Sequence, residues 1–413
     1  MVAACAAAAA AAQTYPSRFT HELARQPVVR AALKHIDDNR DSQLAEWMRI
    51  TEIPAPSRQE QQRSAYVKAE LEKAGLAGVQ VDEIGNVVAV RKGRESGPAL
   101  VLAAHLDTVF PADTPIQVRR EGSTLRAPGV FDNSASVANL LAAVRAIEGA
   151  GLRTRRDLVF LFTVQEEVGL RGMRHWLERN RDRTGMLVAL DSGLPGVWYG
   201  ALGIQWLKFI YTSAGAHTNS SRGRPNPARA VAAAIQNIYT IPLPPPGEAT
   251  GIYNVGMIGG GKVFNAISQE SFFTVDIRSN EPEVHQDLAV RIRRMAEDAA
   301  RQERVGFRVE VVSDSTAAGT ARQLAGRRAH PIVQTAVDIQ TYLDIGRGRP
   351  IRAVASGSTD ANVGVGMGIP SIAVGRSYGG DQHTLQEYAD IDSAYLGTKQ
   401  IVLLAAALGE LVP

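Results

Sequence analysis

Two hydrophobic patterns alternate along the chain. Four short runs are apolar almost throughout, which is typical of strands buried on both faces of a parallel sheet: 99–104, 158–164, 186–190 and 370–374. Around them lie segments whose apolar residues recur at helical spacing: 19–50, 135–147, 170–179, 331–342 and 392–411. This alternation predicts an α/β fold with a mostly parallel sheet and helices on both faces.

Local motifs add detail to this pattern. Ser57 and Glu60 match a helix capping box, so we expect a further helix that ends near Ala74, before Gly75. Short strands are predicted at 79–81 and 87–90, and a hairpin at 118–125.

The pattern changes near Trp198. From there the elements predicted are strand, helix, strand, strand, helix and strand, at 203–213, 227–239, 252–258, 271–278, 282–303 and 307–312. Such a unit is large enough to bury a small core of its own. We therefore expect a discontinuous α/β domain at 18–198 and 314–413, interrupted by an α+β (β-α-β-β-α-β) domain at 199–313.

Length and composition fit this two-domain organisation. A chain of 413 residues exceeds one ordinary core, and 45 basic against 42 acidic residues leave a net charge of only +3. Basic residues are not clustered with aromatic ones, so we expect no nucleic-acid partner. The single Cys5 allows no internal disulfide and no cysteine-based zinc site. Apolar runs are too short to predict a membrane span.

Residues 1–17 form an alanine-rich tail. Its end, Ala11-Ala12-Gln13, resembles the cleavage region of a secretory signal, and Val2-Ala3-Ala4-Cys5 resembles a lipoprotein box, although no charged or strongly apolar segment precedes them. A remnant of a signal would predict export to the periplasm or secretion. A plain alanine-rich tail would predict a cytoplasmic protein. The two interpretations weigh equally.

Residues of the kind that bind metals follow the predicted strands. His105 and Asp107 come at the end of one strand, and further candidates follow along the chain: Asp132, Glu166, Glu167, Asp191 and His383. A single His-x-Asp motif is weak evidence for a metal site. In an open α/β sheet, however, ligands bind at the carboxyl ends of the parallel strands, where these residues are expected. Two imidazoles and several carboxylates suit a pair of zinc ions, for which Asp132 is the candidate bridge.

The adjacent acids Glu166 and Glu167 are expected to have different functions, one as a metal ligand and the other as a proton acceptor. Neighbours at a strand end point in different directions, so one carboxylate can bind metal while the other accepts a proton. We assign Glu167 as ligand and Glu166 as general base. Each acid alone is better explained as a solvent-facing residue at a helix start. Their recurrence at successive strand ends favours the metal site.

Five segments together resemble the co-catalytic zinc metallopeptidase family of peptidase T (tripeptidases), aminoacylases, carboxypeptidase G and succinyl-diaminopimelate desuccinylase: 104–109, 129–133, 163–169, 189–191 and 381–384. The resemblance runs from about residue 40 to the end of the chain. It implies a catalytic metal-binding domain with an inserted lid or dimerisation domain.

The resemblance also implies a pairing of ligands. One zinc ion is expected on His105, Asp132 and Asp191, and the other on Asp132, Glu167 and His383. Asp107 would orient His105, Glu166 would be the base, and a cis peptide would follow Asp132. Cobalt and manganese are alternatives to zinc.

Further site residues are carried over in the same way. His217, on a glycine turn, would stabilise the oxyanion, commonly from the partner subunit of a homodimer. Asn265 and Arg278 would grip the substrate, and Gly357 and Ser358 would line its pocket. The plainer alternatives are an exposed loop for His217, a structural ion pair for Arg278 and a helix cap for Asp360.

These residues together predict hydrolysis of an amide by metal-activated water. Asp191 is the choice of tripeptidase-like members, so we expect an aminopeptidase cleaving di- or tripeptides. The alternatives are an N-acyl-amino-acid deacylase or a carboxypeptidase. A metal-dependent peptide-binding protein without turnover is a hypothesis of another class, against which the free base Glu166 argues.

Overall fold

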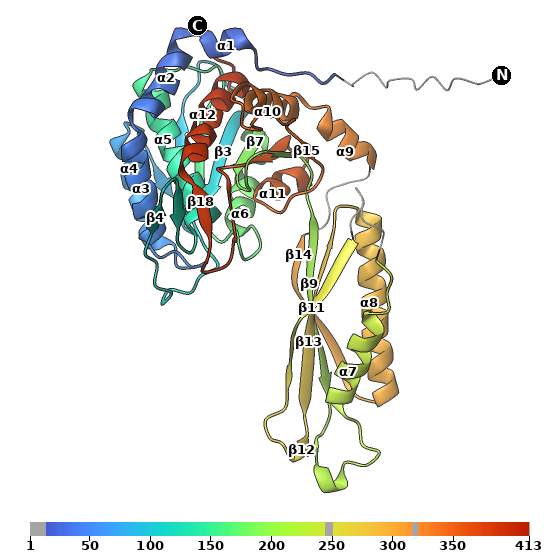
Figure 1. Cartoon of the computed structure of the whole chain (residues 1–413). Helices are drawn as coiled ribbons and strands as arrows, with labels where there is room; N and C mark the ends of the chain where they lie inside the picture. The colour runs from blue at the N-terminus through green and yellow to red at the C-terminus, as the bar shows by residue number, and fades with distance from the viewer. Residues whose placement is uncertain (1–13, 244–250, 316–320, 413) are drawn as a thin grey trace, which may run out of the picture.

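The computed structural model describes residues 14–243, 251–315 and 321–412 (Figure 1). Most of the alanine-rich tail, including both processing-site resemblances, lies outside the described residues. Figure 1 shows a large domain at the top and an elongated one extending below it.

The large domain is built on an eight-stranded sheet. Its order is β1 (Gln80–Val81), β2 (Val87–Arg91), β6 (Leu158–Thr163), β3 (Ala99–His105), β7 (Thr184–Leu190), β16 (Ser371–Val374), β8 (Val197–Trp198) and β15 (Ala353–Val354). The four central strands β6, β3, β7 and β16 are parallel to one another, while β2 and β8 run antiparallel beside them. These central strands are the apolar runs of the sequence, so the predicted α/β fold is confirmed.

Helices cover both faces of this sheet, and β3 shows why its residues are all apolar. Leu100 and Leu102 face the main core with α5 (Ser136–Gly149) and α12 (Ile391–Leu408). Val101 and Ala103 point to the other face, where α6 (Arg171–Asn180) packs. Alternate side chains of a strand lie on opposite faces, so a strand covered twice needs no polar position.

The remaining helices and strands of the large domain complete its shell. They are α1 (His21–Arg25), α2 (Pro27–Asp38), α3 (Arg40–Glu52), α4 (Gln61–Lys73), α9 (Ala321–Arg328), α10 (Pro331–Tyr342), α11 (Ala361–Gly366) and a small sheet of β17 (Gly379–Gly380), β18 (Tyr388–Asp390), β5 (Thr124–Arg126) and β4 (Arg119–Glu121). No helix in these described ranges is long and apolar enough to cross a membrane.

The segment 19–50 is helical, as its spacing predicted, and is divided into α1, α2 and most of α3. Pro27 begins α2, because the N–H that proline lacks has no partner in the first turn of a helix. The capping box of α4 does not form. The Ser57 hydroxyl donates to Asp107 Oδ2 at 2.6 Å, and Glu60 Oε1 accepts from the backbone N–H groups of Arg58 and Gln165.

The inserted domain follows the predicted order of elements. These are β9 (Gly203–Thr212), α7 (Pro227–Ile238), β11 (Gly251–Gly260), β13 (Glu270–Ser279), α8 (Pro282–Glu303) and β14 (Gly306–Ser315). The strands form an antiparallel sheet in the order β11-β13-β9-β14, and α7 and α8 cover one face (Figure 1). Phe209 and Phe273 stack beneath them with ring centroids 5.0 Å apart. The limits 198/199 and 313/314 stay a prediction.

The far end of the inserted domain carries a small ribbon. There β10 (Ala216–His217) pairs with β12 (Ala266–Ile267). Figure 1 shows β12 at the end of the inserted domain that points away from the large domain.

Candidate metal centre

The carboxyl ends of the four parallel strands meet at one edge of the large sheet. His105 ends β3, Asp191 follows β7, Arg376 follows β16, and Glu166 and Glu167 follow β6. Since β6, β3, β7 and β16 are neighbours in the sheet, these side chains gather where an open α/β sheet normally binds its ligand.

Two further groups reach this edge from turns. Asp132 lies in the helical turn Val130–Ala135 before α5, and the peptide between Asp132 and Asn133 is cis, as the resemblance implies. His383 lies between β17 and β18 with φ +63°, in the left-handed region that most residues avoid. Ser192 (φ +82°) and Gln165 (φ +57°) are also left-handed and adjoin metal-type residues. Strained backbone of this kind clusters at functional sites.

The imidazoles and carboxylates lie close together in two overlapping groups. One is His105, Asp132 and Asp191, and the other is Asp132, Glu167 and His383. Asp132 Oδ1 is 3.2 Å from His105 Nε2, and its Oδ2 is 3.5 Å from His383 Nε2. Each oxygen of Asp132 therefore faces a different imidazole, as a bridging carboxylate requires.

These residues fit divalent metal ions. Imidazole nitrogens and carboxylate oxygens are ligands of zinc and similar ions. Glu167 Oε1 is buried without a hydrogen-bond donor, although His383 Nε2 is only 3.2 Å away. A buried carboxylate oxygen without a donor is costly unless a cation satisfies it.

The adjacent acids Glu166 and Glu167 do not diverge as predicted. β6 ends at Thr163, so both acids lie in the turn beyond it and strand alternation does not apply. Each brings a carboxylate oxygen near His105, within a further group of His105, Glu166 and Glu167. What distinguishes them is His383, which lies 3.2 Å from Glu167 and belongs to no group with Glu166 among the described residues.

Asp107 connects these acids to His105. Its Oδ1 accepts from the backbone N–H of Glu166 at 2.9 Å, and its Oδ2 accepts from that of Glu167 at 3.1 Å. Asp107 Oδ1 is also 3.5 Å from His105 Nδ1, the ring nitrogen that faces away from Asp132. A carboxylate behind a metal-type histidine orients the ring.

Burial and neighbouring charge shift the pKa values of these groups in opposite directions. Burial raises the pKa of Glu166 well above its ordinary value, as expected of a carboxyl suited to carry a proton. Burial opposes ionisation of Asp132 too, but the charge of Arg376 and hydrogen bonds from the two histidines outweigh it and hold its pKa well below the ordinary range. Burial and neighbouring charge thus move the pKa values of two carboxyls in one cluster in opposite directions.

A cavity of about 420 Å³ opens onto this cluster from between the two domains. Its walls include eight residues predicted for the site: His105, Asp132, Glu166, Glu167, Asp191, Arg278, Ser358 and His383. The inserted domain adds Ile204 and Trp206, which share the sheet face opposite its helices with Arg278, since Arg278 pairs with Ile204 across β13 and β9.

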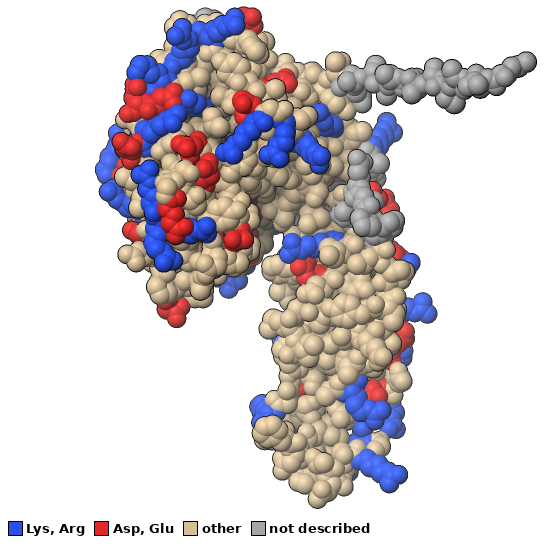
Figure 2. Space-filling model, in the orientation of Figure 1, with Lys and Arg blue, Asp and Glu red and all other residues tan. Residues whose placement is uncertain are grey.

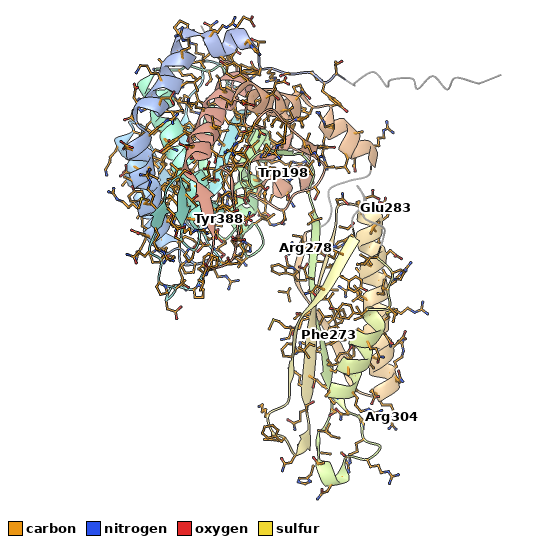
Figure 3. All side chains as sticks on the ribbon, in the orientation of Figure 1. Trp198, Phe273, Arg278, Glu283, Arg304 and Tyr388 are labelled. Carbon is orange, nitrogen blue, oxygen red and sulfur yellow. The ribbon has the colours of Figure 1, made fainter. Side chains whose placement is uncertain are left out.

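Four predicted residues lie outside this cavity wall. Asp107 is buried behind His105, and Gly357 packs against Trp198. His217 and Asn265 belong to the ribbon at the far end of the inserted domain, where the backbone of Asn265 accepts from Thr218. Figure 3 shows Arg278 at the opposite end, toward the large domain. Arg278 also donates to Asp276 at 2.9 Å, so the structural ion pair and the position in the cavity coexist.

The sequence reasoning missed two buried charged residues at the centre. Arg376 lies beside Asp132 and Asp191, and Glu387 accepts three backbone hydrogen bonds from the turn that carries Asp132. Arg376 follows a buried parallel strand as His105 and Asp191 do, so the rule that located them applied to it as well. Glu387 does not follow a buried parallel strand, so the same rule could not identify it.

Fold and site define a hydrolase class in which an α/β domain holds a carboxylate–imidazole metal cluster under an inserted α+β domain. Residues 101–407 match peptidase family M20/M25/M40. The chain belongs to this family of metal-dependent peptidases and hydrolases.

Individual proteins are similar to this chain in sequence or in fold. A protein of Pyrococcus abyssi named as a LysW-lysine/LysW-ornithine hydrolase is 29% identical over 171 residues, which are 41% of this chain and 46% of that protein. A tripeptidase of Staphylococcus aureus superposes with TM-score 0.72 at 20% identity, covering 90% of this chain and 99% of its own. A dinuclear metal-binding M20 peptidase of Bacillus subtilis superposes with TM-score 0.65 at 16% identity, over 91% and 100%. At these identities the structures share the fold.

Proposed function

We propose that this protein is a dinuclear zinc aminopeptidase that cleaves di- or tripeptides. One observation carries the proposal: the two oxygens of Asp132 face His105 and His383, each with a further carboxylate beside it, Asp191 or Glu167. His105, Asp132 and Asp191 would hold one ion, and Asp132, Glu167 and His383 the other.

The chemistry is hydrolysis of an amide. The ions, when bound, polarise the scissile carbonyl and make water a stronger acid. Glu166 then takes the proton of the attacking water and delivers it to the leaving nitrogen. Its high pKa suits both halves of this transfer, because a weakly acidic carboxyl holds the proton until the nitrogen accepts it.

The cavity supports a short substrate with a free carboxylate. Arg278 presents a guanidinium fork that matches a carboxylate in bidentate geometry. Ile204 and Trp206 beside it offer an apolar wall for a side chain. Ser358, with its neighbour Gly357, would contact the substrate backbone. Asn265 lies far from the cluster of its own subunit, so it would bind the substrate only at the site of a partner subunit.

His217 would complete the site from the partner in a homodimer. It is exposed on the ribbon far from its own cluster, as is Asn265. Large apolar side chains are exposed on the same domain: Ile252, Met257, Ile258, Val263, Phe264, Val311 and Val312. Figure 2 shows that the visible face of this domain is mostly uncharged along its middle, whereas charges are scattered over the large domain. Five of these side chains, from Ile252 to Phe264, lie on the edge strand β11 and the turn after it, so this edge is the candidate contact of the dimer.

The decisive test compares three substrates: Ala-Ala-Ala, N-acetyl-Ala-Ala-Ala and N-acetyl-alanine. The protein is stripped with a chelator, then reloaded with Zn²⁺, Co²⁺ or Mn²⁺. Cleavage of the free tripeptide alone, to alanine and Ala-Ala, is expected, because an aminopeptidase needs the free amino group that the two blocked substrates lack. Cleavage of N-acetyl-alanine would identify a deacylase, and release of C-terminal alanine from the blocked peptide a carboxypeptidase. Binding of peptides without cleavage under every metal would favour the peptide-binding hypothesis.

A further inference from the structure

Arg376 is anchored by its backbone before its side chain reaches the metal centre. It follows β16, its N–H donates to the carbonyl of Ser192 at 3.1 Å, and its own carbonyl accepts from Asn139 Nδ2 at 2.9 Å. α12 approaches so closely that a Cβ on Gly397 would lie 2.2 Å from the Arg376 carbonyl oxygen. The guanidinium therefore enters the cluster from a rigid position, and its side chain is 0% exposed.

The guanidinium contacts the cluster and its immediate support. Nη1 donates to Asp191 Oδ1 and, at 3.1 Å, to Asn133 Oδ1. Nη2 lies 3.2 Å from Asp132 Oδ1, an ion-pair contact without a hydrogen bond. Its Cζ lies 4.1 Å above the ring of Phe131. Within the described ranges it contacts two members of the group His105, Asp132 and Asp191, and forms no ion pair with Glu167.

The two oxygens of Asp191 are thereby given different roles. Oδ1 accepts from Arg376 and from the backbone N–H of Ser192 at 2.6 Å. Oδ2 is left toward His105, 4.0 Å from its Nε2. A carboxylate with one oxygen held by two donors presents the other oxygen alone.

We infer that Arg376 is a positioning residue that holds Asp191, which belongs to the site on His105 alone, and thereby sets the affinity of that site more strongly than that of the other. This inference rests on the dinuclear site proposed above. A buried cation is costly unless it is paired, and Arg376 is paired with the carboxylates that need orienting. Groups that orient metal ligands typically change metal affinity about 10–100-fold when removed.

The test titrates metal-free full-length protein with Zn²⁺ by calorimetry and chelator competition. The wild type is expected to bind two ions. Arg376→Met should weaken one ion about 10–100-fold and the other clearly less, because only Asp132 is shared by the two sites. Arg376→Lys, which keeps the charge but loses the planar fork, should weaken the same ion less. The matched control is Arg91→Met, because Arg91 is also buried and paired, with Glu148, away from the cluster.

A purely structural Arg376 would give a different result. It would lower thermal stability without separating the two ions, so unchanged affinity at both sites, or equal loss at both, overturns the inference. Near-ultraviolet circular dichroism checks folding, and if Arg376→Met does not fold, the same criteria are applied to Arg376→Lys. Two bound ions in a wild type that hydrolyses no amide would overturn the proposed function and leave this inference standing.

Discussion

The carboxylate of Glu387 accepts a hydrogen bond of 2.7 Å from the backbone N–H of Asp132. It also accepts from Phe131 at 2.8 Å and from Gly129 at 3.1 Å. One buried side chain thus holds the whole turn that presents the central carboxylate of the cluster. Burial raises the pKa of Glu387 to about 7, and the three donors oppose that rise.

We expect Glu387→Gln to loosen this turn. The amide replaces one acceptor oxygen with an N–H group that would face a backbone donor, which leaves buried groups unpaired. Unfolding in urea should show a loss of about 1–3 kcal/mol. Zn²⁺ affinity, measured with a competing chelator, should fall about 10–100-fold. Gln386→Ala, at the exposed neighbour, is the control, and a Glu387→Gln protein that matches it in both measurements would contradict the role given to Glu387.

The positions of the main metal-type residues could be predicted because two simple rules combine. Uninterrupted apolar runs identify strands buried on both faces, and the carboxyl ends of parallel strands share one edge. His105 and Asp191 follow from these rules alone. Their grouping with Asp132 and His383 needed the family resemblance, since turns are not located by periodicity.

The supporting contacts could not be predicted, because they join residues far apart in the chain. Ser57 matched a local capping box, yet its hydroxyl donates to Asp107, fifty positions along the chain. The long-range partner prevailed because a buried carboxylate needs donors more than an exposed helix end needs a cap. His217 lies far from its own cluster because the inserted sheet is long. Hydrophobic periodicity predicts the strands of that sheet, but not which of their ends lies near the metal site.

Replacing the proposed base separates catalysis from binding. Glu166→Gln keeps the size and neutral form of the side chain but cannot take a proton from water. The hydrolysis rate should fall about 10²–10⁴-fold, while two metal ions and the peptide still bind. Stopped assays for turnover and equilibrium dialysis for the metal and the peptide measure the two properties separately.

Glu167→Gln provides the contrast for this experiment, because Glu167 is the proposed ligand. It should lose one tightly bound ion as well as activity. If instead Glu166→Gln loses the ion and Glu167→Gln keeps it, the two roles are reversed.

Mixing two inactive variants tests whether His217 acts on the partner's cluster. His217→Ala and Glu166→Gln each damage every site of a homodimer. After the subunits exchange, each heterodimer would have one site with both Glu166 and the partner's His217 intact. Activity should therefore return on mixing, in proportion to the heterodimer formed.

Two controls make this result specific. Mixing two samples of the same variant must restore nothing, and analytical ultracentrifugation must show dimers. A protein that is monomeric, or mixtures that stay inactive although heterodimers are present, would place the action of His217 elsewhere.

Asp360 makes stability depend on pH. The sequence suggested a helix cap, but its side chain makes no capping bond to α11; Oδ2 accepts from Thr163 Oγ1 at 2.5 Å and Oδ1 is buried without a partner. Burial raises the pKa of this carboxyl from its ordinary 3.8 to about 7. The folded protein therefore keeps a proton, between these two pH values, that the unfolded chain has released.

The sign of the effect follows from this difference in bound protons. Stability from Asp360 is fully present below pH 3.8 and is lost as the pH rises through about 7. Asp360→Asn is uncharged at every pH, so its stability relative to the wild type should improve from pH 5 to about pH 7 and then level off toward pH 8. Urea unfolding of the metal-free proteins across this range measures the change, with Asp113→Asn at an exposed site as control. A constant difference between wild type and Asp360→Asn would show that Asp360 is already ionised at pH 5 in the folded protein.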